Sequence, residues 1–388
     1  MKHIMGKGRT QTRTRGLQSG LTILELLLSM ALGVALMAGI SQVFVGMRQT
    51  DRTVEVASRM QEAGRFALTL LGRELRTSSY LGCSSTVGDE AFNTILATIP
   101  ASFQPRTGVQ GWEADGTGTG DTNNSSTGVA VESASSTNTS WDTSGGNILP
   151  PTNVVPDSDI LRVWNVDPGI QGTVLSVIQG VTPSLSLSDM DIAVGDILLL
   201  SDCEFIDIVQ ACSIAEAAGP PVTLTVALST SCSPGNAASS QIVVGAGASV
   251  SKLNGTLYYV GKRNNAAANP PSLFRRTLGN NALPGTTEEL VEGVESMQLL
   301  YGENSDNDFR NTADRFVTAD LVTDWTNVVS VRMELLVQSV EDNLAPAPQP
   351  YTFHGLDYDG AVGNGDLPED KRLRRVFTTT VNLRNRTL

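Results

Sequence analysis

A long uncharged run near the start of the chain sets the first constraint on its fold. The 22 residues from Leu26 to Met47 carry no charge, close to the roughly 20 residues with which an α-helix spans a hydrocarbon core of about 30 Å. A secretory signal peptide has a shorter apolar core, of about 7 to 15 residues. The sequence therefore predicts a transmembrane helix over residues 21–47.

The charges on either side of this run predict its orientation. Charges of both signs follow the run, whereas the first twenty residues contain no acid and five basic residues, Lys2, Lys7, Arg9, Arg13 and Arg15. By the positive-inside rule, the N-terminus is expected to lie in the cytoplasm. The residues after the helix would then form a head on the opposite side of the membrane.

One acidic residue, Glu25, stands at the beginning of the apolar run. A carboxylate in a membrane helix costs about 2 to 3 kcal/mol at mid-depth and less near an end, so insertion tolerates Glu25 without gaining from it. A plain membrane anchor is the simpler interpretation, but it leaves the acid unexplained. Acidic residues within a membrane more often mark a function that involves a partner.

The same region resembles the class III signal of type IV pilins. A basic leader is followed by Gly20 and then by the stretch LTILELLLSMALGVALMAGI. The resemblance implies that residues 1–20 are a leader peptide, that a prepilin peptidase cuts after Gly20, and that the new N-terminus at Leu21 is methylated. Glu25 would become the fifth residue of the mature chain and act in assembly. Phenylalanine is commoner in the family at the position of Leu21.

The composition argues against direct binding of nucleic acid. The chain has 27 basic and 40 acidic residues, a formal net charge of −13 that includes the basic leader. Nucleic-acid binding needs a basic surface. With 388 residues, of which 40% are hydrophobic, the chain can bury one sizeable core or two smaller ones.

The four cysteines follow the apolar run and predict disulfides. In a periplasmic head, disulfides persist, and four cysteines allow three pairings. A zinc site would need close cysteine pairs or histidine ligands, and the chain has only His3 and the distant His354. The cysteines are Cys83, Cys203, Cys212 and Cys232.

A helical pattern continues beyond Met47. Small and apolar residues recur at spacings of three and four, which predicts an amphipathic continuation of the helix over residues 48–77 that packs under a globular head. These residues are Ala57, Met60, Gly64, Ala67, Leu68, Leu71 and Leu75.

The head, residues 78–388, reads as mainly β-structure. Residues 113–151 are rich in Gly, Ser, Thr and Asn, which predicts a long flexible loop. Strand-like stretches follow, among them DILRVWNV, DILLLSDC, PVTLTVAL and GTLYYVGK. The clearest alternation lies in NVVSVRMELLVQSV. Such runs between turns favour antiparallel sheets, so the expected fold class is α+β: a long N-terminal helix on an antiparallel, β-rich head.

Several stretches of the head resemble the PilW family of type IV pilus assembly proteins. They are ELRTSSYLGC, LLLSDCEFIDIVQ, LVEGVESMQLLYG, DWTNVVSVRMELLV and RRVFTTTVNLRNR. The resemblance implies a minor pilin of the inner membrane that primes or caps pilus assembly with other minor pilins and the major pilin. A head of this size is expected to fit the pilus tip better than repeated use along the shaft. Cys83 and Cys203 lie in the family-like stretches, so the resemblance implies that they pair and leaves Cys212 and Cys232 as an added bridge.

The sequence shows no catalytic motif, so we expect no enzyme activity and no cofactor. Neither a G-x-S-x-G elbow, nor H-E-x-x-H, nor a phosphate-binding loop is present. His354 is expected to be a surface or packing residue. A hydrolase with two catalytic carboxylates, in an anchored periplasmic enzyme, stays open as an alternative.

One acidic segment raises a calcium hypothesis. Within GENSDNDFRNTADRF, Asn304, Asp306 and Asp308 offer side-chain oxygens at alternating positions, as short calcium loops do, and Asp314 is available beyond them. The glycine that an EF-hand turn needs is missing. A polar hairpin connection is the favoured interpretation.

The cluster KRLRR, residues 371–375, precedes the strand pattern VFTTTVNL. A charged edge strand or a contact with a partner is favoured over a patch for DNA or lipid.

Two other functions remain open alongside a minor pilin. A type II secretion pseudopilin of the J type would have the same architecture. A pilus-tip adhesin would use aromatic residues of the long loop region, Trp112 and Trp141, as anchors.

Overall fold

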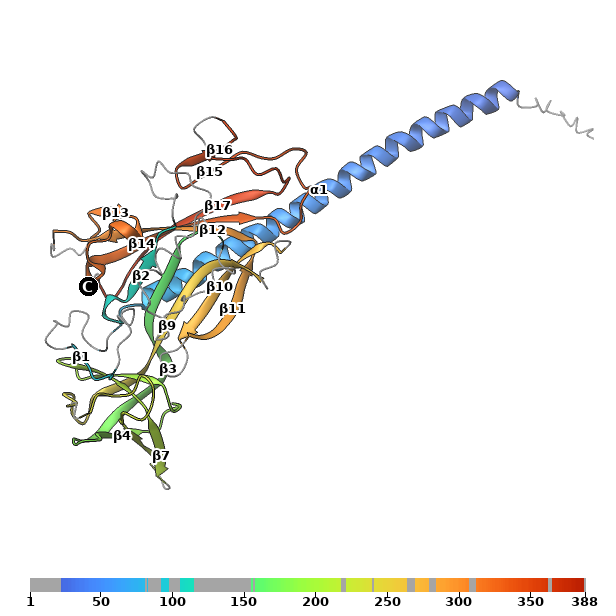
Figure 1. The fold of residues 1–388 in the computed structure, drawn as a ribbon. Coiled ribbons are helices and arrows are strands. Elements are labelled where there is room, and N and C mark those ends of the chain that lie inside the picture. The colour runs from blue at the N-terminus through green and yellow to red at the C-terminus, as the bar shows by residue number, and fades with distance from the viewer. Residues whose placement is uncertain are drawn as a thin grey trace, which may run out of the picture. The chain divides into compact units, whose positions relative to one another are not determined.

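The structure is a computed structural model, and Figure 1 shows its elements. Its described residues are 22–80, 82, 92–97, 105–114, 155, 158–217, 221–238, 241–263, 269–278, 284–306, 312–361 and 365–386. The chain divides into two units, Met1–Glu55 and Val56–Leu388. Most of the predicted loop over residues 113–151 lies outside the described residues.

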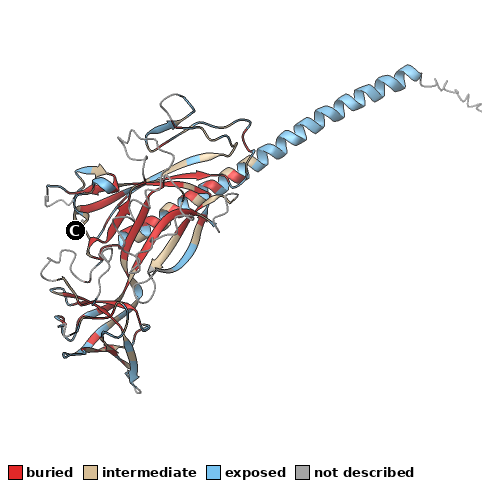
Figure 2. Cartoon of the chain, in the orientation of Figure 1, coloured by how far each residue is buried: buried red, intermediate tan, exposed pale blue. Residues whose placement is uncertain are grey.

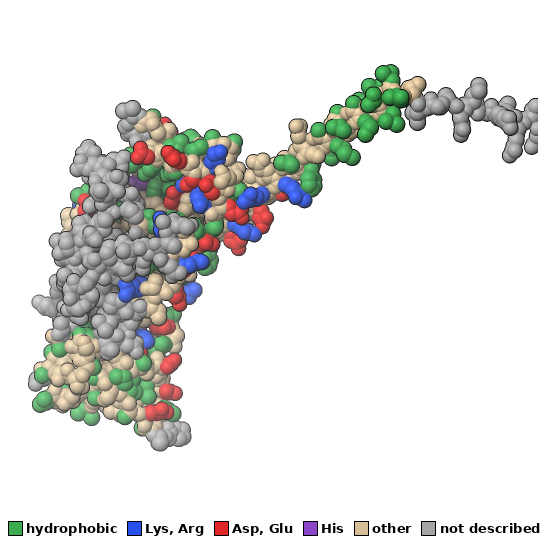
Figure 3. All heavy atoms as spheres, turned by 45° about the vertical axis from the view of Figure 1, so that its right-hand side comes forward, with side chains coloured by type: hydrophobic (Ala, Val, Ile, Leu, Met, Phe, Trp, Pro, Cys, Tyr) green, Lys and Arg blue, Asp and Glu red, His purple; other side chains and the backbone are tan. Residues whose placement is uncertain are grey.

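A single helix, α1 (Ile23–Thr77), begins in the first unit and ends in the second. In the first unit its side chains are almost all exposed, and Figure 3 shows hydrophobic side chains gathered around this part of the helix. An 18-residue window there has a mean hydropathy of 2.2 and no buried residue. Apolar side chains that are exposed in this way are stable in the hydrocarbon core of a bilayer. This part of α1 therefore fits a single-pass membrane anchor.

In the second unit, α1 buries one face against the sheets of the head. Met60, Leu71 and Leu75 belong to the same hydrophobic cluster as Val331 and Met333. Their spacing along the helix places them on one side. Figure 2 shows this buried stripe along the helix and on the strands that it contacts.

The larger sheet of the head has eleven strands, with the central order β1-β6-β5-β9-β3-β4-β8-β7. In addition, β2 pairs with β3, and β10 pairs with both β9 and β11. Its strands are β1 (Phe92–Thr94), β2 (Val109–Trp112), β3 (Ile160–Ile178), β4 (Ser184–Ser188), β5 (Ile197–Ser201), β6 (Ile206–Gln210), β7 (Ser213–Ala217), β8 (Thr223–Ala227), β9 (Ser249–Lys262), β10 (Pro271–Leu278) and β11 (Pro284–Glu292).

A second sheet has four strands in the order β13-β12-β14-β17, and a hairpin joins β15 to β16. The bounds are β12 (Val294–Glu303), β13 (Arg315–Val317), β14 (Val328–Gln338), β15 (Tyr351–Phe353), β16 (Leu356–Tyr358) and β17 (Arg374–Asn382). Short 3-10 turns are η2 (Pro105–Thr107), η5 (Ala319–Leu321) and η6 (Trp325–Asn327).

The expected α+β fold is confirmed, with refinements. All pairings between the described strands are antiparallel except that of β1 with β6, which is parallel. The alternation predicted for β14 is incomplete, because Leu336 on the face away from α1 is buried as well. It lines a pocket with residues of the β15–β16 hairpin, which explains its burial.

The two longest strands of the large sheet, β3 and β9, pair with each other along most of their length. Their outer ends reach a lobe built from β4, β7 and β8, as Figure 1 shows. A hydrophobic cluster joins the lobe to β5, β6 and β9. It includes Leu187 and Val226 of the lobe together with Leu198, Val209 and Val250. A third cluster, around Trp164 and Tyr259, lies elsewhere in the head.

Candidate functional site

The helix start holds Glu25 in a reciprocal cap. Glu25 N donates to Thr22 Oγ1 at 3.3 Å, and Thr22 N donates to Glu25 Oε2 at 3.2 Å. The Thr22 hydroxyl also contacts Oε2 at 3.3 Å. This arrangement is a capping box, which satisfies backbone N–H groups that the first helical turn leaves without partners. The Thr-x-x-Glu spacing of this capping box is visible in the sequence, whereas the family resemblance implies only a role in assembly for Glu25.

The predicted processing site cannot be placed beside this cap. Gly20 and Leu21 lie outside the described residues, so cleavage after Gly20 and methylation of Leu21 stay predictions. The cap nevertheless puts the Glu25 carboxylate beside the backbone N–H of Thr22, the residue that follows Leu21.

Within the head, a glycine lets α1 approach the edge strand β17 closely. A Cβ atom at Gly64 would lie 2.5 Å from ring atoms of Phe377, a distance that real Cβ contacts do not reach. The absence of a side chain at Gly64 therefore lets the Phe377 ring pack directly on the helix backbone.

Another face of α1 in the head borders an apolar groove. The groove has a volume of about 510 Å³ and is lined by Met60, Ala63 and Phe66 of the helix and by Leu290 and Val340 of the head. Phe66 is 53% exposed. Such a surface can pack against another apolar surface, and aromatic side chains are common anchors of protein interfaces.

The structure contains the disulfide expected between Cys212 and Cys232, with Cα atoms 5.3 Å apart. It closes the segment that carries β7 and β8 of the lobe. Cys203 is disulfide-bonded as well. Cys83 lies outside the described residues, so its pairing with Cys203 stays a prediction.

The calcium candidates adopt an arrangement that suits a polar hairpin connection. Asp314 Oδ2 accepts hydrogen bonds from Ser305 N at 2.7 Å, Ser305 Oγ at 3.0 Å and Asp306 N at 3.3 Å. These bonds lower the pKa of Asp314. Asn304 is buried, and Asp308 lies outside the described residues.

Among the residues that the structure describes, no group of three or more His, Cys, Asp or Glu side chains could hold a metal ion. The calcium hypothesis stays untested at Asp308, which is not among them.

The basic cluster at residues 371–375 begins the edge strand β17, as the sequence favoured. Arg374 is 3% exposed and is held by two carboxylates. Its Nε lies 2.7 Å from Glu295 Oε2, and its Nη1 lies 2.7 Å from Asp370 Oδ1. Burial lowers the pKa of Arg374, but the bonds to Asp370 and Glu295 raise it overall. Arg374 is thus part of an internal ion-pair network.

His354 packs in the β15–β16 turn, in agreement with the expectation. Its side chain is 8% exposed, and its Nδ1 lies 3.7 Å from Glu334 Oε2. The backbone at His354 has a positive φ of 49°.

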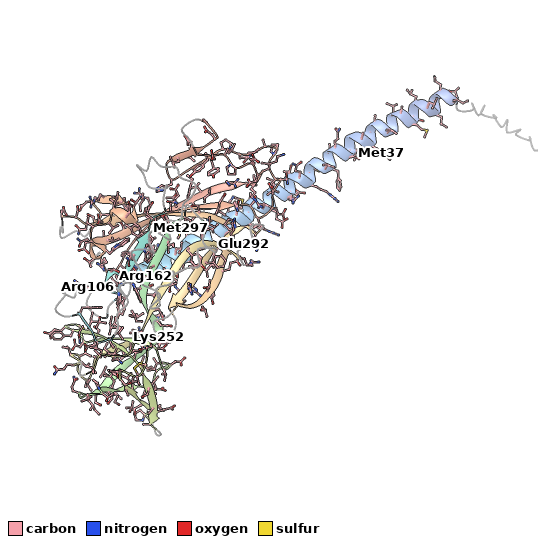
Figure 4. The ribbon with its side chains drawn as sticks, in the orientation of Figure 1. Met37, Arg106, Arg162, Lys252, Glu292 and Met297 are labelled. Carbon is pink, nitrogen blue, oxygen red and sulfur yellow. A yellow bond between two sulfur atoms is a disulfide. The ribbon has the colours of Figure 1, made fainter. Side chains whose placement is uncertain are left out.

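A buried arginine was not anticipated from the sequence. Arg162 of β3 is fully buried, and its Nη2 donates to Gln110 Oε1. Its guanidinium lies 5.0 Å from the Trp112 ring and 5.6 Å from the Trp164 ring, a cation–π arrangement. Burial lowers the pKa of Arg162 to about 9. Figure 4 labels Arg162 among the strands of the head.

Trp112, a candidate anchor for an adhesin, is therefore buried at 7% exposure. Trp141, the second candidate, lies outside the described residues. Local sequence gave no signal for the Arg162 cluster, because its members come together only when β2 pairs with β3.

Comparison with known proteins identifies one region of the chain. A family model described as Type IV Pilus-assembly protein W matches residues 257–385. The match begins within β9 and includes the whole four-stranded sheet. It covers about a third of the 388 residues and leaves out α1. No curated protein and no solved structure matches the chain.

Proposed function

We propose, from the match of residues 257–385 to the family of type IV pilus assembly protein W, that this chain belongs to that family and is a minor pilin that primes or caps pilus growth. Its role in type IV pilus assembly follows from the family. The minor-pilin role rests on one observation above all: α1 joins an apolar segment, headed by Glu25, to a large β-rich head. The two regions support the same assignment independently, because the matched region does not include the helix.

Glu25 supplies the chemistry of assembly in this proposal. Cleavage after Gly20 creates a positively charged amine at Leu21, and in a filament the amine of a neighbouring subunit can approach Glu25. In an apolar surround the attraction between the two charges is much stronger than in water, and an unpaired charge is correspondingly costly. A subunit out of register would bury its carboxylate unpaired, so Glu25 sets the register of the growing filament.

The head determines where the chain acts. It would stand in the periplasm, where disulfides such as Cys212–Cys232 persist. A head with two sheets and an additional lobe suits the end of a filament better than repeated use along a shaft. The proposed partners are other minor pilins, the major pilin, the prepilin peptidase and the inner membrane. The proposal assigns the chain no catalytic activity and no cofactor.

Substitution of Glu25 tests this function. We expect Glu25→Leu to be inserted and cleaved as the parent is, but to fail to co-purify with other pilins or to support piliation. Piliation at the parental level would overturn the role of Glu25.

Thr22→Val is the matched control, because Glu25 also caps α1. This variant breaks the Thr22 side of the capping box at a cost of about 1 kcal/mol in helix stability, but it leaves the carboxylate in place. Retained piliation in Thr22→Val would assign the Glu25→Leu defect to lost pairing. Equal loss in both variants would assign it to the helix cap.

The family match favours a pilus over a type II secretion pseudopilin of the J type. The subunits that co-purify with the chain after crosslinking in the membrane distinguish the two systems. Pilins support the proposal, and secretion pseudopilins contradict it.

A further inference from the structure

A groove of about 680 Å³ lies beside the end of α1. Its walls come from the last helical turn, from β3, β9 and β10, and from the segment after β17. Five cationic side chains line the groove, against two anionic ones, Glu74 and Asp167. The cations are Arg73, Arg76, Lys252, Arg275 and Arg384, and Figure 4 labels Lys252 on its strand. We call this site the basic groove.

Two of the five cations are neutralised by neighbours. Lys252 Nζ lies 2.9 Å from Asp196, and Arg275 Nη2 lies 2.6 Å from Glu288. The other three have no ion pair within the part of the chain that the structure describes, and all three are exposed: Arg73, Arg76 and Arg384. The Glu74 carboxylate accepts a hydrogen bond from Asn165 Nδ2 at 2.9 Å, so it already has a partner.

The fold brings together the two segments that carry these three guanidinium groups. Arg73 and Arg76 are three residues apart on the helix, so their side chains share a face. Asn385 Nδ2 donates to the Ser78 carbonyl oxygen at 2.7 Å, which holds the segment of Arg384 against the end of α1. Arg386 donates to the carbonyl oxygens of Thr326 and Arg106 and fixes the same segment on its other side.

This concentration of positive charge contrasts with the chain as a whole, whose net charge is −13. Guanidinium groups bind carboxylates through paired, charge-assisted hydrogen bonds. The volume lies in the range of sites that take a ligand the size of a few amino-acid residues. Val166, Pro168 and Tyr80 add apolar and aromatic surface to the lining, which suits a peptide better than a bare inorganic anion.

We propose that the basic groove binds an acidic peptide segment on the head of another pilus subunit, with Arg73, Arg76 and Arg384 as the residues that hold its carboxylates. This inference rests on the proposed function, because it assumes that the chain assembles with other subunits. It adds the surface and the chemistry of one such contact, and this contact is separate from the pairing of Glu25.

The test uses the full chain in detergent micelles and a fluorescein-labelled peptide, Gly-Glu-Glu-Tyr-Glu-Glu-Gly, followed by fluorescence anisotropy. The control peptide carries Gln in place of each Glu. The test variant combines Arg73→Gln, Arg76→Gln and Arg384→Gln, whose side chains are exposed. Arg65→Gln is the matched control, because Arg65 is an exposed arginine of the same helix outside the groove.

We expect the glutamate peptide to bind saturably and the glutamine peptide not to bind. The triple variant should weaken binding at least about tenfold, as the loss of several charged contacts does, and Arg65→Gln should not change it. Unchanged binding by the triple variant overturns the proposal, as does an equal loss in Arg65→Gln. Displacement of the peptide by inorganic triphosphate at equal charge concentration shows a general anion site and also overturns it.

The experiments on Glu25 and on the basic groove can refute their two proposals independently. A defect in peptide binding leaves the Glu25 experiment untouched, and normal piliation of Glu25→Leu would refute the assembly role without altering peptide binding.

Discussion

At the scale of single residues, the packing of α1 against β17 depends on the close contact between Gly64 and Phe377. Alanine normally favours a helix over glycine by about 1 kcal/mol, but a Cβ at Gly64 would lie 2.5 Å from the Phe377 ring. We expect Gly64→Ala to destabilise the head by about 1 to 3 kcal/mol, as overpacking does. Thermal unfolding of the full chain in detergent measures this change.

Two further variants isolate the clash between Gly64 and Phe377. Gly72→Ala should leave the head at least as stable as the parent, because a Cβ there would lie 3.5 Å from Val381, an ordinary contact. Adding Phe377→Leu to Gly64→Ala should recover part of the lost stability. No recovery in this double variant would show that the ring is not the cause.

Asp370 gives a residue-scale prediction about pH. The hydrogen bonds from Arg374 lower the pKa of Asp370 below its ordinary value of 3.8. The folded state therefore favours the ionised carboxylate, so the stabilisation is complete above the ordinary pKa and is lost as the pH falls through the lower, folded pKa. The relevant window lies below about pH 4.

We expect Asp370→Asn to lower the stability of the head at pH 7 by about 1 to 3 kcal/mol, the range for hydrogen bonds to charged groups. The difference in the free energy of unfolding between the parent and this variant should shrink as the pH falls from 4 to 2. Unfolding curves recorded across that pH range measure it. Asp366→Asn is the control, because Asp366 is exposed and should give no such difference. If Asp370→Asn lowered the stability by the same amount at every pH, the charge of Asp370 would not be the cause.

At the scale of elements, the Cys212–Cys232 bridge supports the lobe of β4, β7 and β8. The two cysteines are 20 residues apart, and closing a loop of this size stabilises by about 3 kcal/mol in the chain-entropy model. We expect the double variant Cys212→Ser and Cys232→Ser to exchange backbone amide hydrogens faster in the lobe, while β12 and β14 stay protected. Hydrogen exchange with mass spectrometry measures this. Faster exchange across the whole head would mean that the lobe is not a separate unit of stability.

Some of these elements could be predicted from the sequence because their patterns are local. The helix spacing of Met60, Ala67 and Leu71 predicted the buried face of α1, and the alternation around Met333 predicted β14. The parallel pairing of β1 could not be predicted, because a strand of three residues carries no periodicity of its own.

The candidate sites also differ in whether a local sequence pattern could reveal them. The role proposed for Glu25 rests on a local motif. The basic groove brings Arg73 of the helix together with Arg384, more than three hundred residues later in the chain. Only the fold makes them neighbours, so no local pattern could reveal the groove.

At the scale of the whole molecule, the proposed processing would decide whether the chain can leave the membrane for a filament. Gly20 has no side chain at the expected cut, so Gly20→Val should crowd the peptidase and leave all 388 residues in the membrane. Intact mass measurement distinguishes this chain from one that begins at Leu21. A parental mature N-terminus at any other residue would contradict the assignment of the signal.

The antiparallel ladder between β3 and β9 determines how the head would respond to mechanical load. Backbone hydrogen bonds of such a ladder run across the strands, and these two strands extend without a chain break from the part of the head that contacts α1 to the lobe. Both strands meet the lobe at the same end of the ladder, so a pull on the lobe would load both backbones in the same direction and would not slide one strand past the other. At the end of a filament under tension, the lobe could therefore transmit force to the rest of the head while its strands stay paired.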